Sequence, residues 1–180
     1  MSLLIKSSLT CLLLLFVIPM ESMCQDQKSL YSTEMKLIQA AREIMSSAET
    51  CALISVDATG SPRVRTMDPF MPDSSLTVWF GTNPHSRKVA QIKKDPRVTL
   101  YYLDKDASGY VTIHGKAQIV DEQTEKDKRW KKEWEAFYPD KVESYTLIKV
   151  SPVWMEIVSP PRGILGDDTS WTPPVVRFEH

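Results

Sequence analysis

The amino-acid sequence predicts a mainly β fold with peripheral α-helices, built as a closed or split antiparallel β-barrel of about six strands. Six segments carry strand patterns, and short turns rich in Asp, Ser, Pro and Gly separate most of them. Strands do not alternate regularly with helices, which argues against a doubly wound parallel sheet. The 180 residues suit one domain, and 42% of them are hydrophobic, which is enough to bury a full core.

Short turns set the limits of the expected strands. The strands are expected at residues 52–56, 63–70, 76–80, 98–103, 110–120 and 146–158. Turns are expected at 57–62 and 71–74, and a loop at 104–109. Gly115 lies within the fifth strand and predicts a bulge or bend there. Pro152 lies within the sixth strand, which is therefore expected to be an edge strand or a bulged one.

Two peripheral helices are expected besides a short basic one. The first begins at Ser32 or Thr33, after a disordered arm of residues 25–31, and ends near Ala48. Its apolar residues recur at helical spacing: Leu37, Ile38, Ala41, Ile44, Met45 and Ala48. The second begins at Thr124 and ends at Pro139. Its aromatic residues share one helical face and predict a core or subunit contact rather than a ligand-stacking surface: Trp130, Trp134, Phe137 and Tyr138.

The N-terminus has the pattern of a secretory signal peptide. Lys6 precedes an uncharged, leucine-rich run over residues 7–20, which is too short to span a bilayer comfortably. We expect a leader at residues 1–24 and an exported mature chain, periplasmic or secreted, that begins at Gln25 and has no transmembrane span. Lipid anchoring at Cys24 is the alternative. Cleavage would leave Cys51 as the single cysteine, which is expected to be a core residue and not a reactive thiol.

A short basic helix carries the strongest functional signal. Asn83-Pro84 is a helix-start pattern, and Asp95-Pro96 ends the segment. The first turn is expected to carry Ser86, Arg87 and Lys88, although the N-terminus of a helix prefers acidic side chains. Two cations and a hydroxyl beside free N–H groups favour a cradle for a phosphate. The alternative interpretation is that both cations are simply solvated.

Other classes of function find little support. The net charge of −1 argues against a nucleic-acid binder. His85, His114 and His180 are isolated, so no metal site is expected. There is no convincing catalytic triad, nucleotide-binding glycine loop or pair of carboxylates. A phosphate site without acid–base machinery favours a cofactor that brings its own reactivity.

Three blocks of sequence resemble the pyridoxamine 5'-phosphate oxidase-like superfamily of FMN-binding split barrels, in the branch of the general stress proteins. They are residues 60–67 (Gly-Ser-Pro-Arg-Val-Arg-Thr-Met), residues 79–88 (Trp-Phe-Gly-Thr-Asn-Pro-His-Ser-Arg-Lys), and Asp95-Pro96-Arg97-Val98 followed by residues 114–117 (His-Gly-Lys-Ala). The resemblance covers residues 33–158. It divides the chain into the leader (1–24), an FMN-binding split-barrel domain (25–158) and a C-terminal tail (159–180).

The resemblance also implies a homodimer that holds two FMN molecules at the subunit interface. Arg65 matches an arginine that reaches the flavin phosphate, and Ser86, Arg87 and Lys88 match the phosphate-binding helix start. The remaining positions implied to bind FMN are Thr66, Met67, Asp68, Thr82 and Tyr110. Tyr110 departs from the family, because the oxidases carry a glutamine there.

The implied function is that of an FMN flavoprotein, an oxidoreductase that acts on an unidentified small molecule. The oxidases hold pyridoxamine phosphate with a C-terminal Arg-x-His element, and the tail here reads Pro161-Arg162-Gly163 instead. Oxidation of that substrate is therefore not expected. The alternatives are a deazaflavin-dependent reductase and a non-catalytic haem- or flavin-binding protein on the same fold.

Overall fold

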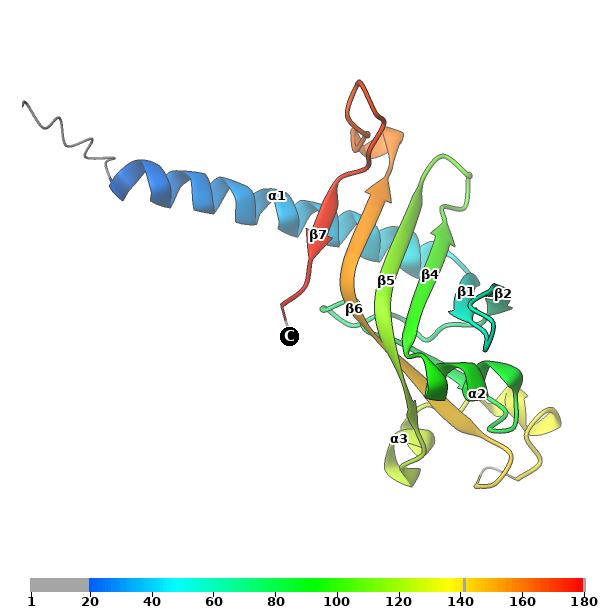
Figure 1. Ribbon diagram of the computed structural model, residues 1–180. Coiled ribbons are helices and arrows are strands. Elements are labelled where there is room, and N and C mark those ends of the chain that lie inside the picture. Colours follow the sequence, from blue (N-terminus) through cyan, green and yellow to red (C-terminus); the bar gives the residue numbers. More distant parts are fainter. Residues whose placement is uncertain (1–19, 141, 180) are drawn as a thin grey trace, which may run out of the picture. The chain divides into compact units, whose positions relative to one another are not determined.

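The computed structural model describes residues 20–140 and 142–179, with side chains from residue 29 onward. The chain divides into two units, residues 1–33 and residues 34–180, and the second contains the sheet. Seven antiparallel strands follow in chain order: β1 (Cys51–Val56), β2 (Pro62–Met67), β3 (Val78–Thr82), β4 (Arg97–Leu103), β5 (Tyr110–Val120), β6 (Thr146–Val158) and β7 (Val175–Arg177). Their spatial order is β2-β1-β4-β5-β6-β3, with β7 also on β6 (Figure 1). The expected mainly β fold with peripheral helices is confirmed.

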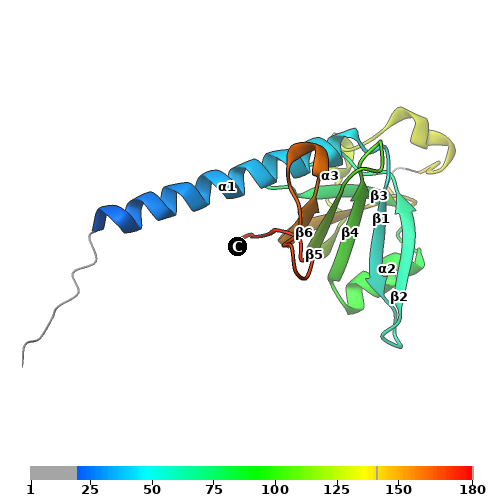
Figure 2. The same ribbon diagram turned by 90° about the horizontal axis from the view of Figure 1, so that it is seen from above.

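The sheet curls so that its two outer strands approach each other, as the view from above shows (Figure 2). A single antiparallel bridge between Pro69 and Phe80 joins the chain after β2 to β3, and the Phe70 N–H donates to the Trp79 carbonyl at 2.8 Å. The ladder does not continue from there. The molecule is therefore a split barrel that this bridge joins at one point.

Strand β6 exchanges one neighbour for another along its length. Its first part pairs with β3 as far as Val150, and its later part pairs with β7 from Trp154 onward. Of the two expected alternatives, an edge strand or a bulged one, the bulged strand is confirmed, and β6 has a neighbour on both sides over most of its length. The structure has seven strands where six were expected, because β7 in the C-terminal tail pairs with the later part of β6. Beyond Pro152 the backbone groups of β6 need new partners, and the C-terminal tail supplies them.

The bulge that Gly115 and Pro152 predict is present. His114 pairs with Trp154 and Gly115 pairs with Pro152, so Val153 is the extra residue on β6. A Cβ atom at position 115 would lie 2.6 Å from the Ser151 carbonyl oxygen. Glycine is thus required for the two strands to approach closely at the bend.

The first helix, α1 (Met20–Ser47), packs its expected apolar stripe against the sheet. Ala41, Ile44 and Met45 are fully buried in the main core, and the other stripe residues contact it. The helix begins earlier than expected, so the expected disordered arm at 25–31 was wrong. Residues 20–47 contain neither Pro nor Gly, so no helix-breaking residue separates the expected arm from the helix. None of the helices in the described part of the chain is long and apolar enough to cross a membrane.

The second expected helix is broken into two short pieces. They are α3 (Gln123–Lys128) and a 3-10 helix, η1 (Lys132–Ala136). The break lies at Arg129, whose carbonyl accepts a hydrogen bond from the Tyr145 hydroxyl at 2.6 Å. Three of the four aromatic residues, Trp130, Trp134 and Tyr138, still pack in a small second core around Tyr145. Phe137 does not, since it is 75% exposed.

We expect Gly115→Ala to lower the free energy of unfolding by about 1–3 kcal/mol, because the new methyl group must displace the Ser151 backbone. Thermal or urea unfolding followed by circular dichroism measures this loss. Lys116→Ala, at the exposed neighbouring position, serves as the control and should change stability by less than about 0.5 kcal/mol. An unchanged melting temperature for Gly115→Ala would show that the bend has room to relax.

Candidate functional site

The basic helix α2 (Arg87–Lys94) begins with an extended residue, Ser86, at its N-cap. The expected start at Asn83 was wrong, because this residue closes a separate turn: its side-chain Oδ1 accepts from the His85 N–H at 2.7 Å, and its carbonyl accepts from the Ser86 N–H at 3.1 Å. Arg87 and Lys88 are thus the first two residues of the helix. The Ser86 Oγ atom is buried and has no hydrogen-bond partner.

Arg65 of β2 is fixed by two side chains from neighbouring elements. Its guanidinium donates to Ser55 Oγ of β1 at 2.7 Å and to Gln91 Oε1 of α2 at 2.8 Å. Ser55 is fully buried and itself donates to Gln91 Oε1 at 2.8 Å. These three residues form a hydrogen-bonded triangle that joins β1, β2 and α2. The triangle holds the guanidinium close to the start of the basic helix.

Sequence reasoning missed Ser55 and Gln91, although both left a signal. Ser55 is the one polar side chain in the apolar strand Cys51–Val56, at a position that alternation directs inward. Gln91 lies four residues after Arg87 and thus one turn further along the same helix. A buried serine hydroxyl needs a hydrogen-bond partner, so Ser55 indicates that a polar side chain such as Arg65 or Gln91 reaches it.

Lys88 lies on the inner side of α2 and donates to Thr82 Oγ1 of β3 at 2.9 Å. Partial burial, and secondarily the nearby Arg65, lowers the pKa of Lys88. Burial, and then Arg87 and Arg63, lowers the pKa of Arg65. The structure thus brings Arg65, Thr82, Ser86, Arg87 and Lys88 together.

The cations of this group, Arg65, Arg87 and Lys88, lack a compensating negative charge. No ion pair involves any of them in the part of the chain that the structure describes. Arg63 differs, because it forms an ion pair with Asp57 at 2.7 Å. Their charges also add to the positive end of the α2 macrodipole. An anion bound at the start of α2 would relieve this repulsion, and we call these residues, together with Thr82 and Ser86, the cradle.

Three other predicted site residues lie differently. Met67 is buried in the main core, so its side chain is not available to a ligand. Thr66 is exposed on the opposite face of β2 from Arg65. Asp68 is exposed beyond the end of β2 and forms an ion pair with Lys131 at 2.6 Å. Within one chain, only the backbone of this stretch could approach a ligand held in the cradle.

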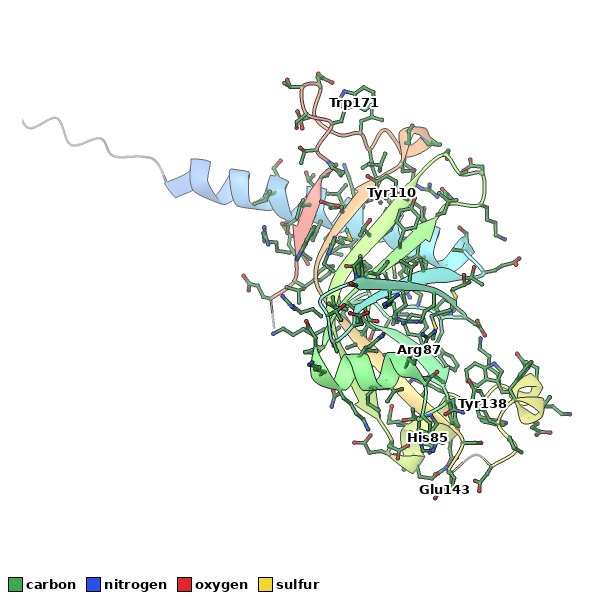
Figure 3. The ribbon with its side chains drawn as sticks, turned by 45° about the vertical axis from the view of Figure 1, so that its right-hand side comes forward. His85, Arg87, Tyr110, Tyr138, Glu143 and Trp171 are labelled. Atoms are coloured by element: carbon green, nitrogen blue, oxygen red, sulfur yellow. The ribbon has the colours of Figure 1, made fainter. Side chains whose placement is uncertain are left out.

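Tyr110 lies away from the cradle. It begins β5, pairs with Leu103 and Val158, and stacks on Tyr101 with 5.5 Å between ring centroids. Three strand spacings, about 14 Å, separate β5 from β2 across the sheet. Figure 3 shows Tyr110 and Arg87 toward opposite ends of the strands. One chain therefore does not place Tyr110 beside the cradle.

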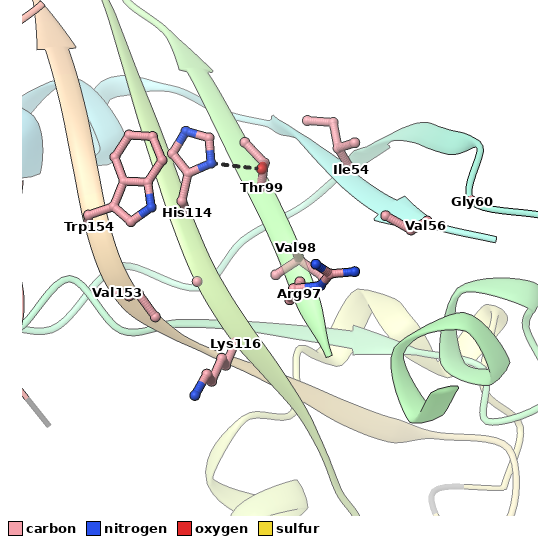
Figure 4. A pocket seen from close by; sticks show the side chains of 11 residues that line it. Ile54, Val56, Gly60, Arg97, Val98, Thr99, His114, Lys116, Val153 and Trp154 are labelled. Carbon is pink, nitrogen blue, oxygen red and sulfur yellow. Dashed lines mark hydrogen bonds between the residues drawn. The ribbon is translucent and has the colours of Figure 1, made fainter. Parts of the chain in front are cut away.

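The outer face of the sheet carries a shallow cavity of about 590 Å³. Its lining includes Ile54, Thr99, His114 and Trp154, which lie in a row across β1, β4, β5 and β6 (Figure 4). His114 stacks on Trp154 with 3.6 Å between ring centroids, and its Nδ1 is 3.2 Å from Thr99 Oγ1. Burial lowers the pKa of His114, so its neutral form is favoured. No group of three potential metal ligands occurs among the described residues.

Solved structures share this architecture. General stress protein 26 from Bacillus anthracis str. Sterne matches with a TM-score of 0.63 and 22% identity, over 79% of this chain and 98% of that one. A protein from Clostridium acetobutylicum related to general stress protein 26 matches with a TM-score of 0.66 and 18% identity, over 80% and 96% of the two chains. An F420 reductase matches with a TM-score of 0.52 and 21% identity, over 63% and 94%. At these identities the likeness establishes the fold.

A search of the curated proteins found no match. The family described as "Pyridoxamine 5'-phosphate oxidase like" matches residues 36–157, a range that contains β1 to β5, nearly all of β6, and the cradle. This range is more than half of the chain and agrees with the residues that carry the resemblance in the sequence. The chain belongs to the pyridoxamine 5'-phosphate oxidase-like family.

Proposed function

We propose that the protein is a flavoprotein that binds FMN through the cradle and acts as an oxidoreductase on a small molecule. The observation that carries this proposal is the cluster of Arg65, Arg87 and Lys88, none of which forms an ion pair among the described residues, next to the unpartnered Ser86 Oγ. A phosphate monoester offers several acceptor oxygens and a negative charge to these donors. Family membership makes a flavin phosphate the natural candidate.

The residues present fit such a phosphate. A buried hydroxyl without a partner is costly unless a ligand completes it, and Ser86 Oγ lies at the helix start where anions bind. Arg65 is held by Ser55 and Gln91, so it needs little reorganisation to donate. In this proposal Arg65, Ser86, Arg87 and Lys88 of the cradle would anchor the phosphate, and Thr82 and the backbone after Arg65 would contact the rest of the cofactor. The bound flavin would supply the hydride or electron transfer.

A site shared between two subunits accounts for the position of Tyr110. In one chain the cradle and Tyr110 are separated across the sheet, so a flavin could contact both only if a second subunit supplied the tyrosine. The outer face of the sheet has apolar side chains to bury in such a dimer: Val64 is 66% exposed, Leu103 47% and Tyr101 37%. We therefore propose a homodimer with the flavin at its interface.

The tail supports an activity other than oxidation of pyridoxamine phosphate. Arg162 is engaged with Asp104 at 3.1 Å and Glu43 at 3.3 Å, so it anchors the tail instead of facing a substrate. Deazaflavin-dependent reduction is a second candidate, because the fold is also that of an F420 reductase.

The proposed export rests on the leader at residues 1–24, of which 1–19 lie outside the described residues. Cys51 fits its expected role, since it is buried and its pKa is raised to about 12.

FMN should bind at least about tenfold more tightly than riboflavin, because each charge-assisted hydrogen bond to phosphate contributes about 1.5–3 kcal/mol. Fluorescence titration of the purified protein measures both affinities.

Arg87→Ala should weaken FMN binding by about tenfold and leave riboflavin binding unchanged. Lys93→Ala, an exposed cation on the same helix, is the control. Equal affinities for FMN and riboflavin would refute the phosphate cradle, and a haem Soret band in the native protein would favour the haem-binding alternative.

FMN affinity should fall with rising alkaline pH, beginning at a lower pH than for an ordinary solvated lysine, because burial lowers the pKa of Lys88 and its charge is lost above that pKa. The ammonium is present below the pKa of the FMN-free protein, so the cradle is complete at neutral pH and weakened at alkaline pH. Lys88→Arg should flatten this dependence, since a guanidinium stays charged. The same slope in the wild type and in Lys88→Arg would assign the pH effect to another group.

Light scattering at micromolar concentration should show a dimer. Val64→Glu places a charge on the exposed outer face of β2 and should shift the protein toward the monomer while lowering FMN affinity. Val142→Glu, at an apolar position that is 56% exposed but outside the sheet, is the matched control. A monomeric wild type with bound FMN would contradict the shared site, and the cradle would then have to hold the flavin alone.

A further inference from the structure

A second cavity, of about 520 Å³, lies between the start of β5 and the C-terminal tail. Tyr110 and Val158 form its sheet side, and the tail contributes Leu165, Asp167, Asp168 and Trp171. Its volume lies within the range of small-molecule sites. Figure 3 shows Trp171 at the same end of the sheet as Tyr110. The cavity is thus separate from the cradle within one chain.

The tail loop that closes the cavity is held in one conformation. Both carboxylate oxygens of Asp167 accept hydrogen bonds within the loop, including those from the Ser170 N–H at 2.8 Å and the Thr172 N–H at 2.9 Å. A Cβ atom on Gly166 would lie 2.4 Å from the Trp171 carbonyl oxygen, so the loop requires glycine there. Arg162 ties the preceding turn to Glu43 and Asp104. These contacts therefore fix the loop that carries Trp171 at the edge of the cavity.

The backbone conformation of Trp171 is strained. Its backbone has a φ of 60°, in the left-handed region that a side chain of this size rarely adopts. Its side chain is 82% exposed, so little packing within the chain offsets this strain. Strain of this kind costs about 1–3 kcal/mol and is typical of ligand-contact positions. A large aromatic side chain held strained at the edge of a cavity indicates contact with something outside the chain.

The charge around the cavity is negative. Asp167 uses its carboxylate inside the loop, which leaves Asp168 as the lining carboxylate without a hydrogen bond or an ion pair among the described residues. Glu156 lies near Tyr110, whose pKa is raised by burial and then by this carboxylate, and it too has no ion pair in the described chain. Aromatic rings beside free carboxylates are the combination that recognises organic cations.

We infer that this cavity binds a small organic cation with an aromatic ring, which contacts Tyr110 and Trp171 and places its positive charge near Asp168. An anionic ligand such as a phosphorylated substrate would be repelled by the same carboxylates. The site does not require the flavin. If the shared site proposed above is correct, the cation would lie beside the flavin of the partner subunit and would belong to the class of its substrates.

Benzyltrimethylammonium is a suitable probe, and titration calorimetry on the FMN-free full-length protein measures its binding. We expect saturable binding with one probe per chain, at least tenfold weaker binding of benzenesulfonate, and quenching of tryptophan fluorescence. Asp168→Asn should weaken binding by about fivefold. Trp171→Leu should weaken it similarly, and Trp171→Phe should retain binding without the quenching. Glu133→Gln, an exposed carboxylate on η1, should bind like the wild type.

Circular dichroism of each variant establishes that it is folded before its affinity is compared. Absence of saturable binding, equal binding of benzenesulfonate, or unchanged affinity in both Asp168→Asn and Trp171→Leu would overturn the inference. FMN affinity is measured on the same preparations. Failure to bind FMN would refute the proposed function and leave the cation site standing, whereas failure to bind the probe would refute the cation site alone.

Discussion

The hydrogen-bonded triangle of Arg65, Ser55 and Gln91 is the interaction on which the candidate site depends. Arg65, Arg87 and Lys88 carry like charges and repel one another: after burial, a neighbouring cation lowers the pKa of both Arg65 and Lys88. The triangle opposes this by giving Arg65 two neutral acceptors on different elements. It thereby fixes α2 against β1 and β2, so that the helix start and the strand arginine point toward the same place.

The split in the barrel allows the C-terminal tail to pair with the later part of β6. A closed barrel would leave no free backbone on β6, and the tail would have no place to pair. The bulge at Val153 ends the pairing of β6 with β3 and opens its later part to β7. Phe178 then donates its N–H to the Val153 carbonyl at 2.9 Å, so the bulged residue itself helps to hold the tail. The same bend therefore shapes the barrel and positions the loop that carries Trp171.

The sequence was informative where a local pattern alone determined the structure. Gly115 and Pro152 indicated the bulge because only a close approach or a missing N–H explains these residues within strands. The stripe from Leu37 to Ala48 indicated the buried face of α1 by its spacing. The break after Lys128 has no local signal in the sequence, and the contact found there comes from the Tyr145 hydroxyl, sixteen residues further along the chain. For the same reason the aromatic spacing suggested one continuous helix.

Some residues of the candidate site could be predicted from local sequence, and others required the fold. Ser86, Arg87 and Lys88 are adjacent in the sequence, and their unfavourable charge at a helix start was visible without a structure. Thr82 and Arg65 came from the family resemblance, and the structure adds the contacts that join them to this group. Met67 also came from the family resemblance. It lies on the same face of β2 as Arg65, but its side chain is buried in the core. Ser55 and Gln91 required the pairing of β1 with β2 and the packing of α2.

The two ends of the sheet differ in charge, and this difference constrains any function of the protein. The cradle end holds the cations Arg65, Arg87 and Lys88, and the tail end holds the carboxylates Asp168 and Glu156. None of these five groups forms an ion pair among the described residues. Within one chain these ends are separated, so neither cluster relieves the other. An antiparallel pair of subunits that packed outer face on outer face could bring the cradle of one chain toward the tail of the other. Opposite charges would then meet across the interface, and a ligand with an anionic end and a cationic neighbour would fit between them.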